Sequence, residues 1–238
     1  MPSSFSIDTP GHAELHLNTR SGNVTIIAEE RDDVLAEEGA SSRGPDTDVT
    51  GRIAFGSAKG GSANMVVRVP KGTDLTVGTI SGRAELRGQI GRARITTVSG
   101  SITVDRAEEL DVRSISGNID VEYCSGRCRL STKSGRAVCG TARDAKVSTV
   151  SGGITLTDSS GKVRAQTVSG TVDVGTQRHG DVAVQTISGS VKIHVPPGVR
   201  PDTELRTLTG RPRVECEKGH DCRIAVRSLS GQINVTPV

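Results

Sequence analysis

The repeating frame of this chain is set by the stretch TTVSGSITV (96–104) and its later equivalent QTISGSVKI (185–193). In both, a Ser-Gly pair follows a Val or an Ile, and segments in which apolar and polar residues alternate lie on either side of it. Within this apolar frame the pair, or its Thr-Gly equivalent, occurs ten times, and from Gly82 onward it returns every 17–21 residues. A period this short and regular predicts a stacked repeat with one β-solenoid rung per unit. The glycines are Gly22, Gly82, Gly100, Gly117, Gly135, Gly152, Gly170, Gly189, Gly210 and Gly231.

Apolar residues keep fixed distances from this glycine, which we number as position 0. Positions −7 and −5 are mostly apolar, as in Leu110 and Val112, and positions +2 and +4 are apolar again, as in Ile119 and Val121. A spacing of two places each pair on one face of a β-strand. The frame lacks the strict six-residue period of a left-handed hexapeptide solenoid. We therefore predict an all-β, single-stranded parallel β-solenoid, a right-handed β-helix with 17–21 residues per rung.

Three further positions close to the glycine each have a constant type of residue. Position −2 is apolar, as in Val168 and Ile187. Because positions −7 and −5 are also apolar, an uninterrupted strand would place the next apolar residue at −3 and not at −2. This predicts a bend in the chain at that point. Positions −3 and −1 are nearly all Ser or Thr, as in Thr167 and Ser169. Because equivalent residues of stacked strands lie about 4.8 Å apart, we expect hydroxyl ladders that bridge neighbouring rungs.

The chain divides into an irregular part and a regular part. Residues 1–80 are expected to form an N-terminal cap and the first rungs, and residues 81–238 the regular repeats of one continuous domain. Within the first part, 29–48 is polar and is expected to form a loop or a detached strand. The sequence ends on a complete rung, which predicts an exposed strand edge and end-to-end self-association. The edge residues would be Ile224, Val226, Ile233 and Val235.

Composition excludes several classes of protein. A formal charge of +3 over 238 residues does not indicate nucleic-acid binding. The sequence has no signal-like start and no apolar run long enough to span a membrane, so a cytoplasmic protein is expected, with envelope association possible through partners. The five cysteines are expected to be reduced thiols.

The T-[VI]-S-G-x-[VI]-x-[VL] frame resembles the putative-adhesin family of bacterial β-strand-repeat proteins, a family of unknown function. The stretches SGNVTIIAEERDDVLAE (21–37) and RVPKGTDLTVGTISG (68–82) are similar to the N-terminal part of that family. The resemblance implies the solenoid fold along nearly the whole chain. Many relatives are associated with the cell envelope, and the family offers no catalytic motif.

Two sets of charged residues are candidates for a ligand face. Asp105 and Glu122 occupy position +5 of neighbouring rungs, with Asp120 nearby, and paired carboxylates about 5 Å apart would suit a retaining glycosidase. The alternative is an outward charge ladder, which the absence of tryptophan and the scarcity of other aromatics favour. Position −6 carries Arg94, Arg129, Lys146 and Arg164, a stripe that suits a polyanion but also serves to keep a sheet soluble.

Cysteine and histidine give no clear metal or catalytic site. Cys216, His220 and Cys222 lie close together in sequence, but structural zinc takes four ligands and no fourth is nearby. Cys128 and Cys139 fall at core positions, where thiols act as small apolar groups. Lys133 interrupts the apolar −2 column. We expect no cofactor and no catalytic residue.

The sequence therefore predicts a non-enzymatic structural or interaction scaffold that associates with itself or with another protein. The alternatives are a carbohydrate-binding or carbohydrate-active β-helix and, third, a protein that binds polyanions along the basic stripe.

Overall fold

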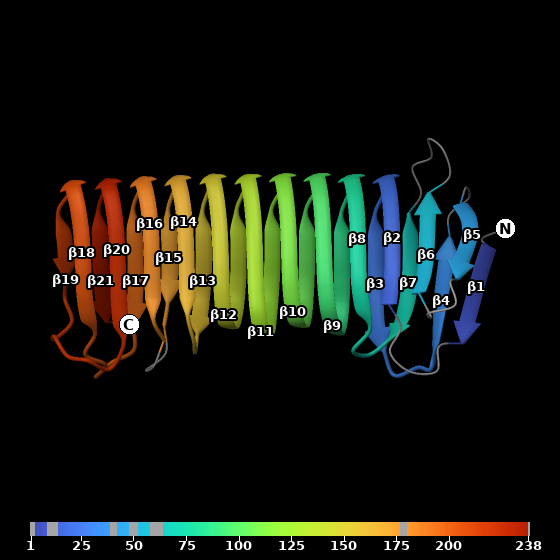
Figure 1. The fold of residues 1–238 in the computed structure, drawn as a ribbon, viewed down its shortest axis with the longest axis horizontal. Coiled ribbons are helices and arrows are strands. Elements are labelled where there is room, and N and C mark those ends of the chain that lie inside the picture. Colours follow the sequence, from blue (N-terminus) through green and yellow to red (C-terminus); the bar gives the residue numbers. More distant parts are fainter. Residues whose placement is uncertain are drawn as a thin grey trace. The chain divides into compact units, whose positions relative to one another are not determined.

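The computed structural model describes residues 3–8, 14–38, 42–47, 52–57, 64–176 and 180–237. Throughout these residues the regular structure is β-strand, and most strands pair in parallel between successive turns (Figure 1). This confirms the predicted parallel β-solenoid. Contacts divide the chain into two compact units, Met1–Ser125 and Gly126–Val238, which are described separately.

Unit 1 contains regular rungs and an antiparallel cap. In the order of the chain its strands are β1 (Ser3–Asp8), β2 (Glu14–Ser21), β3 (Val24–Glu29), β4 (Asp33–Glu38), β5 (Ser42–Thr47), β6 (Arg52–Ser57), β7 (Met65–Pro70), β8 (Asp74–Ser81), β9 (Ala84–Ser99) and β10 (Ile102–Ser116). The segment 29–48, expected as a loop or a detached strand, forms β4 and β5 over much of its length. β4 pairs antiparallel with β1 and β7, and β5 pairs antiparallel with β6.

Unit 2 also consists of rungs, and after β12 its strands are short. After β11 (Ile119–Ser134), which contains the division between the units, come β12 (Ala137–Ser151), β13 (Ile154–Ser159), β14 (Val163–Ser169), β15 (Val172–Gly175), β16 (Val182–Ser188), β17 (Val191–Val195), β18 (Asp202–Thr209), β19 (Pro212–Val214), β20 (Arg223–Ser230) and β21 (Ile233–Pro237). Each rung of this unit has one strand before the Ser-Gly corner and one after it. Their inward side chains share a narrow core.

The last rung of the chain is not the last rung of the stack. β20 pairs with β16 on one side and with β18 on the other, and β21 likewise lies between β17 and β19. The prediction that Ile224, Val226, Ile233 and Val235 form an exposed edge is therefore wrong. All four side chains are buried, because the rung β18–β19 covers the side that was expected to be open.

Chain order and stacking order differ in unit 1 as well. β2 pairs in parallel with both β6 and β8, and β3 pairs with both β7 and β9. The rung β2–β3 thus lies between a rung that follows later in the sequence and the regular repeats. The buried side chains of Leu15, Leu17, Val24 and Ile26 confirm that this first rung contributes to the core.

The strand before the glycine runs straight to the corner, so the predicted bend at position −2 is wrong. In β14, Val163, Ala165 and Thr167 are buried and Val168 is exposed, as in an uninterrupted strand. Position −3 therefore faces the core and position −2 faces solvent. The expected ladder of hydroxyl hydrogen bonds at position −3 is also wrong, because the buried hydroxyls of Thr149, Thr167 and Thr186 have no hydrogen-bond partner.

Stacking at the corner explains the regular spacing of the glycines. Gly170 has a φ of +151°, and a Cβ at this position would overlap the carbonyl oxygen of Gly152 on the neighbouring rung. A side chain is excluded both by the backbone conformation and by the neighbouring backbone. Each rung therefore needs glycine at the same place, which sets the period of the sequence.

Candidate binding face

The strands before the glycines have an outward face on which the type of side chain changes along each strand. The strands are in register, so residues at the same position relative to the glycine stack into a column across neighbouring strands. Successive residues within one column lie about 4.8 Å apart. Charged residues concentrate at positions −8 and −6. Position −4 carries mainly Ser, Thr, Gln and Arg, and there Gln166 donates a 3.2 Å hydrogen bond to Gln185. Position −2 is an exposed apolar column. In unit 2 it contains Val150, Val168, Ile187, Leu229 and Leu208.

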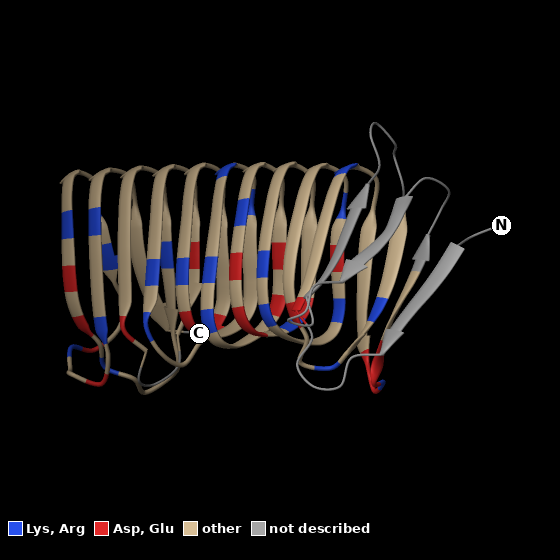
Figure 2. Ribbon diagram, turned by 45° about the vertical axis from the view of Figure 1, so that its right-hand side comes forward, with Lys and Arg blue, Asp and Glu red and all other residues tan. Residues whose placement is uncertain are grey.

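A basic groove lies on this face in unit 2. It has a volume of about 480 Å³, and six basic and two acidic residues line it. Its apolar floor includes Ala183 and Ala225, whose small side chains continue the column that holds Lys146 and Arg164. The basic residues are Arg127, Arg129, Lys146, Lys162, Arg164 and Arg223, and the acidic residues are Asp144 and Asp181. Figure 2 shows Lys and Arg recurring on the strands of neighbouring turns.

The positive charges of the groove are only partly compensated. Arg223 forms a 3.1 Å ion pair with Glu204, whereas Lys146 and Arg164 have no ion-pair partner within the described residues. The two acidic residues are engaged with backbone. Asp144 accepts a 2.8 Å hydrogen bond from the amide of Lys162, and Asp181 accepts one of 3.3 Å from the amide of Arg223. The groove therefore presents an excess of free positive charge.

The predicted basic stripe is thus brought together only in part. Lys146 and Arg164 are cross-strand neighbours, and Arg129 lines the same groove. Arg94 belongs to unit 1, where it lies opposite Asp111 on β10 and Thr76 on β8. Sequence reasoning missed Arg127, Lys162 and Arg223. The signal was present in the sequence, because these three alternate with Asp144 and Asp181 at position −8.

The candidate carboxylates differ from one another in their surroundings. Asp105 accepts a 3.2 Å hydrogen bond from the backbone amide of Gly88, next to an irregularity in the pairing of β9 with β10. This contact ties the Asp105 side chain to the fold. Asp120 and Glu122 are exposed on β11.

The end of the described sheet in unit 2 is formed by β18 and β19. Their described pairing partners, β20 and β21, lie on one side only. This edge carries Pro212, which has no amide hydrogen, and two ion pairs of 2.8 Å, Glu204–Arg206 and Arg213–Glu215. Proline and charge on an edge strand both oppose the addition of another strand.

The Cys216, His220 and Cys222 region has the character of a structural loop. Burial raises the pKa of the Cys222 thiol, and Asp221 raises it further; burial and Glu215 raise the pKa of Cys216. The described residues contain no group of three or more His, Cys, Asp and Glu side chains suited to a metal ion. Cys128 and Cys139 are buried, as predicted.

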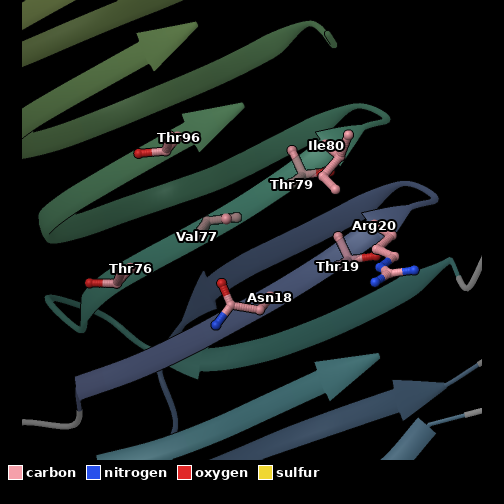
Figure 3. A pocket seen from close by; sticks show the side chains of 9 residues that line it. Asn18, Thr19, Arg20, Thr76, Val77, Thr79, Ile80 and Thr96 are labelled. Carbon is pink, nitrogen blue, oxygen red and sulfur yellow. The ribbon is translucent and has the colours of Figure 1, made fainter. Parts of the chain in front are cut away.

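A second hollow, in unit 1, was not anticipated. It has a volume of about 530 Å³ and is centred on Gly78, which is paired with Asn18 on β2 and Thr96 on β9. Figure 3 shows Asn18 and Arg20 along β2, Thr76 and Ile80 along β8, and Thr96 on β9. The signal was a glycine at position −4, where the neighbouring rungs carry Asn and Thr.

The sequence matches the model of the Toastrack DUF4097 family over residues 12–236. The chain belongs to this family. The Toastrack DUF4097 match spans both units, so each is part of the family domain. A comparison with curated proteins finds no match.

Solved structures support the fold assignment. A putative adhesin from Parabacteroides merdae ATCC 43184 is 10% identical, with a TM-score of 0.59 and coverage of 99% of this chain and 96% of its own. Putative adhesins from Bacteroides fragilis NCTC 9343 (11% identity) and Parabacteroides distasonis ATCC 8503 (9%) each give a TM-score of 0.51, with 99% of this chain and 97% of the other covered. At such low identity the likeness establishes the fold alone.

The described residues contain no helix that is long and apolar enough to cross a membrane.

Proposed function

We propose that this Toastrack protein is a non-enzymatic, adhesin-like interaction scaffold that binds an acidic polysaccharide along the basic groove of unit 2. The observation that carries the proposal is the excess of unpaired positive charge in that groove. Stacked rungs place cations at a repeat of about 4.8 Å, so a linear polyanion can contact several of them at once. The solved structures with the same fold are described as putative adhesins, which agrees with a binding role.

Two alternatives have less support in this protein. Catalysis by Asp105 would require a carboxylate free to react, whereas its side chain holds the Gly88 amide. Self-association by strand addition at the edge of β18 and β19 is opposed by Pro212 and by the ion pairs of Glu204 and Arg213.

The proposal is tested by comparing two double variants that each lose two charges. Lys146→Gln with Arg164→Gln removes the central cations of the groove, and Lys133→Gln with Lys192→Gln removes exposed cations of the same unit elsewhere. Binding of polygalacturonate is measured by fluorescence anisotropy at low salt. We expect the groove variant to bind about tenfold more weakly and the control to bind nearly as wild type. Equal losses in both variants, or wild-type protein that does not bind, would refute the proposal.

A further inference from the structure

The hollow at Gly78 in unit 1 has the features of a site for a small polar ligand. Glycine leaves a gap in a column where the neighbouring strands carry Asn18 and Thr96. The Asn18 amide reaches across this gap, because a Cβ on Gly78 would lie 2.5 Å from its Oδ1. The glycine is thus needed for the position of the Asn18 side chain as well as for the hollow itself.

The walls of the hollow combine three kinds of chemistry. The Asn18 amide and the hydroxyls of Thr76 and Thr96 both donate and accept hydrogen bonds, as sugar hydroxyls do. Ile80 is half exposed and supplies an apolar side. Arg20 is exposed and, within the described residues, has no carboxylate partner. A free guanidinium of this kind binds a carboxylate through two parallel hydrogen bonds.

These groups are arranged on the scale of one sugar residue. Asn18 and Arg20 are two residues apart on the same face of β2, about 7 Å along the strand. Thr96 lies one rung beyond Gly78, about 4.8 Å across the sheet. The volume of about 530 Å³ is within the usual range for small-ligand sites.

From this geometry we infer that the Gly78 hollow binds a carboxylated sugar residue, with the carboxylate on Arg20 and the ring hydroxyls on Asn18, Thr76 and Thr96. This site differs from the groove of unit 2 in its residues and in its mode of recognition. The groove attracts a polymer through its charge, whereas the hollow recognises the hydroxyls and carboxylate of one residue. Binding at the hollow does not rest on the proposed function.

The test uses trigalacturonate and its uncharged counterpart, trigalactose, titrated at millimolar concentration into the full chain at a fixed salt concentration. Arg20→Gln removes the carboxylate partner. Gly78→Thr fills the hollow with a residue suited to a strand, and Gly78 carries no positive φ that would forbid it. Arg106→Gln, an exposed arginine of the same unit, is the matched control for charge.

We expect wild-type protein to bind trigalacturonate saturably and at least about tenfold more tightly than trigalactose. Arg20→Gln and Gly78→Thr should each weaken trigalacturonate binding by about tenfold or more, and Arg106→Gln should not. Circular dichroism verifies the fold of each variant. The inference is overturned by the absence of saturable binding, by equal affinity for the two sugars, or by folded Arg20 and Gly78 variants that bind as wild type.

The groove variant Lys146→Gln with Arg164→Gln separates this inference from the proposed function. It should bind trigalacturonate with unchanged affinity even though it binds polygalacturonate more weakly. A loss of trigalacturonate binding in this variant would place the short ligand in the groove and would refute the site at Gly78.

Discussion

Replacement of Val226 by alanine tests the stacking order at the C-terminal end. Val226 is fully buried, with Val184 of β16 on one side and Leu205 of β18 on the other. The substitution removes two buried carbons, which costs about 1.6 kcal/mol in transfer free energy. Because rungs on both sides hold the cavity open, about 1 kcal/mol is added. We expect a loss of about 2.5 kcal/mol in the free energy of unfolding.

The matched variant is Leu205→Ala in the rung β18–β19. Leu205 is larger but only half-buried, because its described neighbour lies on one side. Removing three half-buried carbons should cost about 1 kcal/mol, with no closed cavity. If the last rung of the chain instead ended the stack, Val226 would be the half-buried residue and the order of the two losses would be reversed.

Urea unfolding followed by circular dichroism measures both variants, and the midpoints are compared at constant m-value. Because repeat proteins can unfold in sections, hydrogen exchange of the β20 amides provides a local readout. A larger loss for Leu205→Ala than for Val226→Ala would refute the inserted position of β20.

Three further predictions, one of them with a control variant, test the fold. Gly170→Ala should cost about 3 kcal/mol because of its positive φ and the neighbouring carbonyl, whereas Gly153→Ala, whose Cβ would have no contact closer than 3.8 Å, should be nearly neutral in urea unfolding. Thr167→Val should raise the free energy of unfolding by about 1 kcal/mol, since it replaces a buried hydroxyl without a partner by a methyl group; a lower midpoint would contradict this. Arg223 holds the pKa of Glu204 below its usual range, so the favourable contribution of Glu204 is present at neutral pH and is lost as the pH falls through that lowered pKa. Glu204→Gln should therefore reduce the acid sensitivity of unfolding, and an unchanged pH profile would count against the ion pair.

The sequence predicts the rung well because its main signals are local. Corner glycines such as Gly170 and alternating core residues such as Val182 and Val184 follow from strand geometry within one repeat. The bend predicted at position −2 was wrong because the apolar side chain of Val168 faces solvent, while the alternation of buried residues continues through Thr167. Strand alternation outweighs polarity at this position.

The order of the rungs could not be obtained from the same signals. The rung β20–β21 has the same apolar frame as the rung β16–β17, so the sequence allows β20 to lie beside β16 or at the end of the stack. The candidate site has the same limitation. Lys146 and Arg164 were found as a column, but the contribution of Arg223 depends on β20 lying next to β16.

The salt dependence of polygalacturonate binding tests the binding role of the basic groove most directly. For wild-type protein we expect the logarithm of the binding constant to fall linearly with the logarithm of the NaCl concentration, because bound cations release counterions from the polymer. Loss of Lys146 and Arg164 should reduce the magnitude of that slope by about one to two. Binding that is independent of salt, or a slope unchanged by the loss of both cations, would contradict the proposal that the groove binds an acidic polymer.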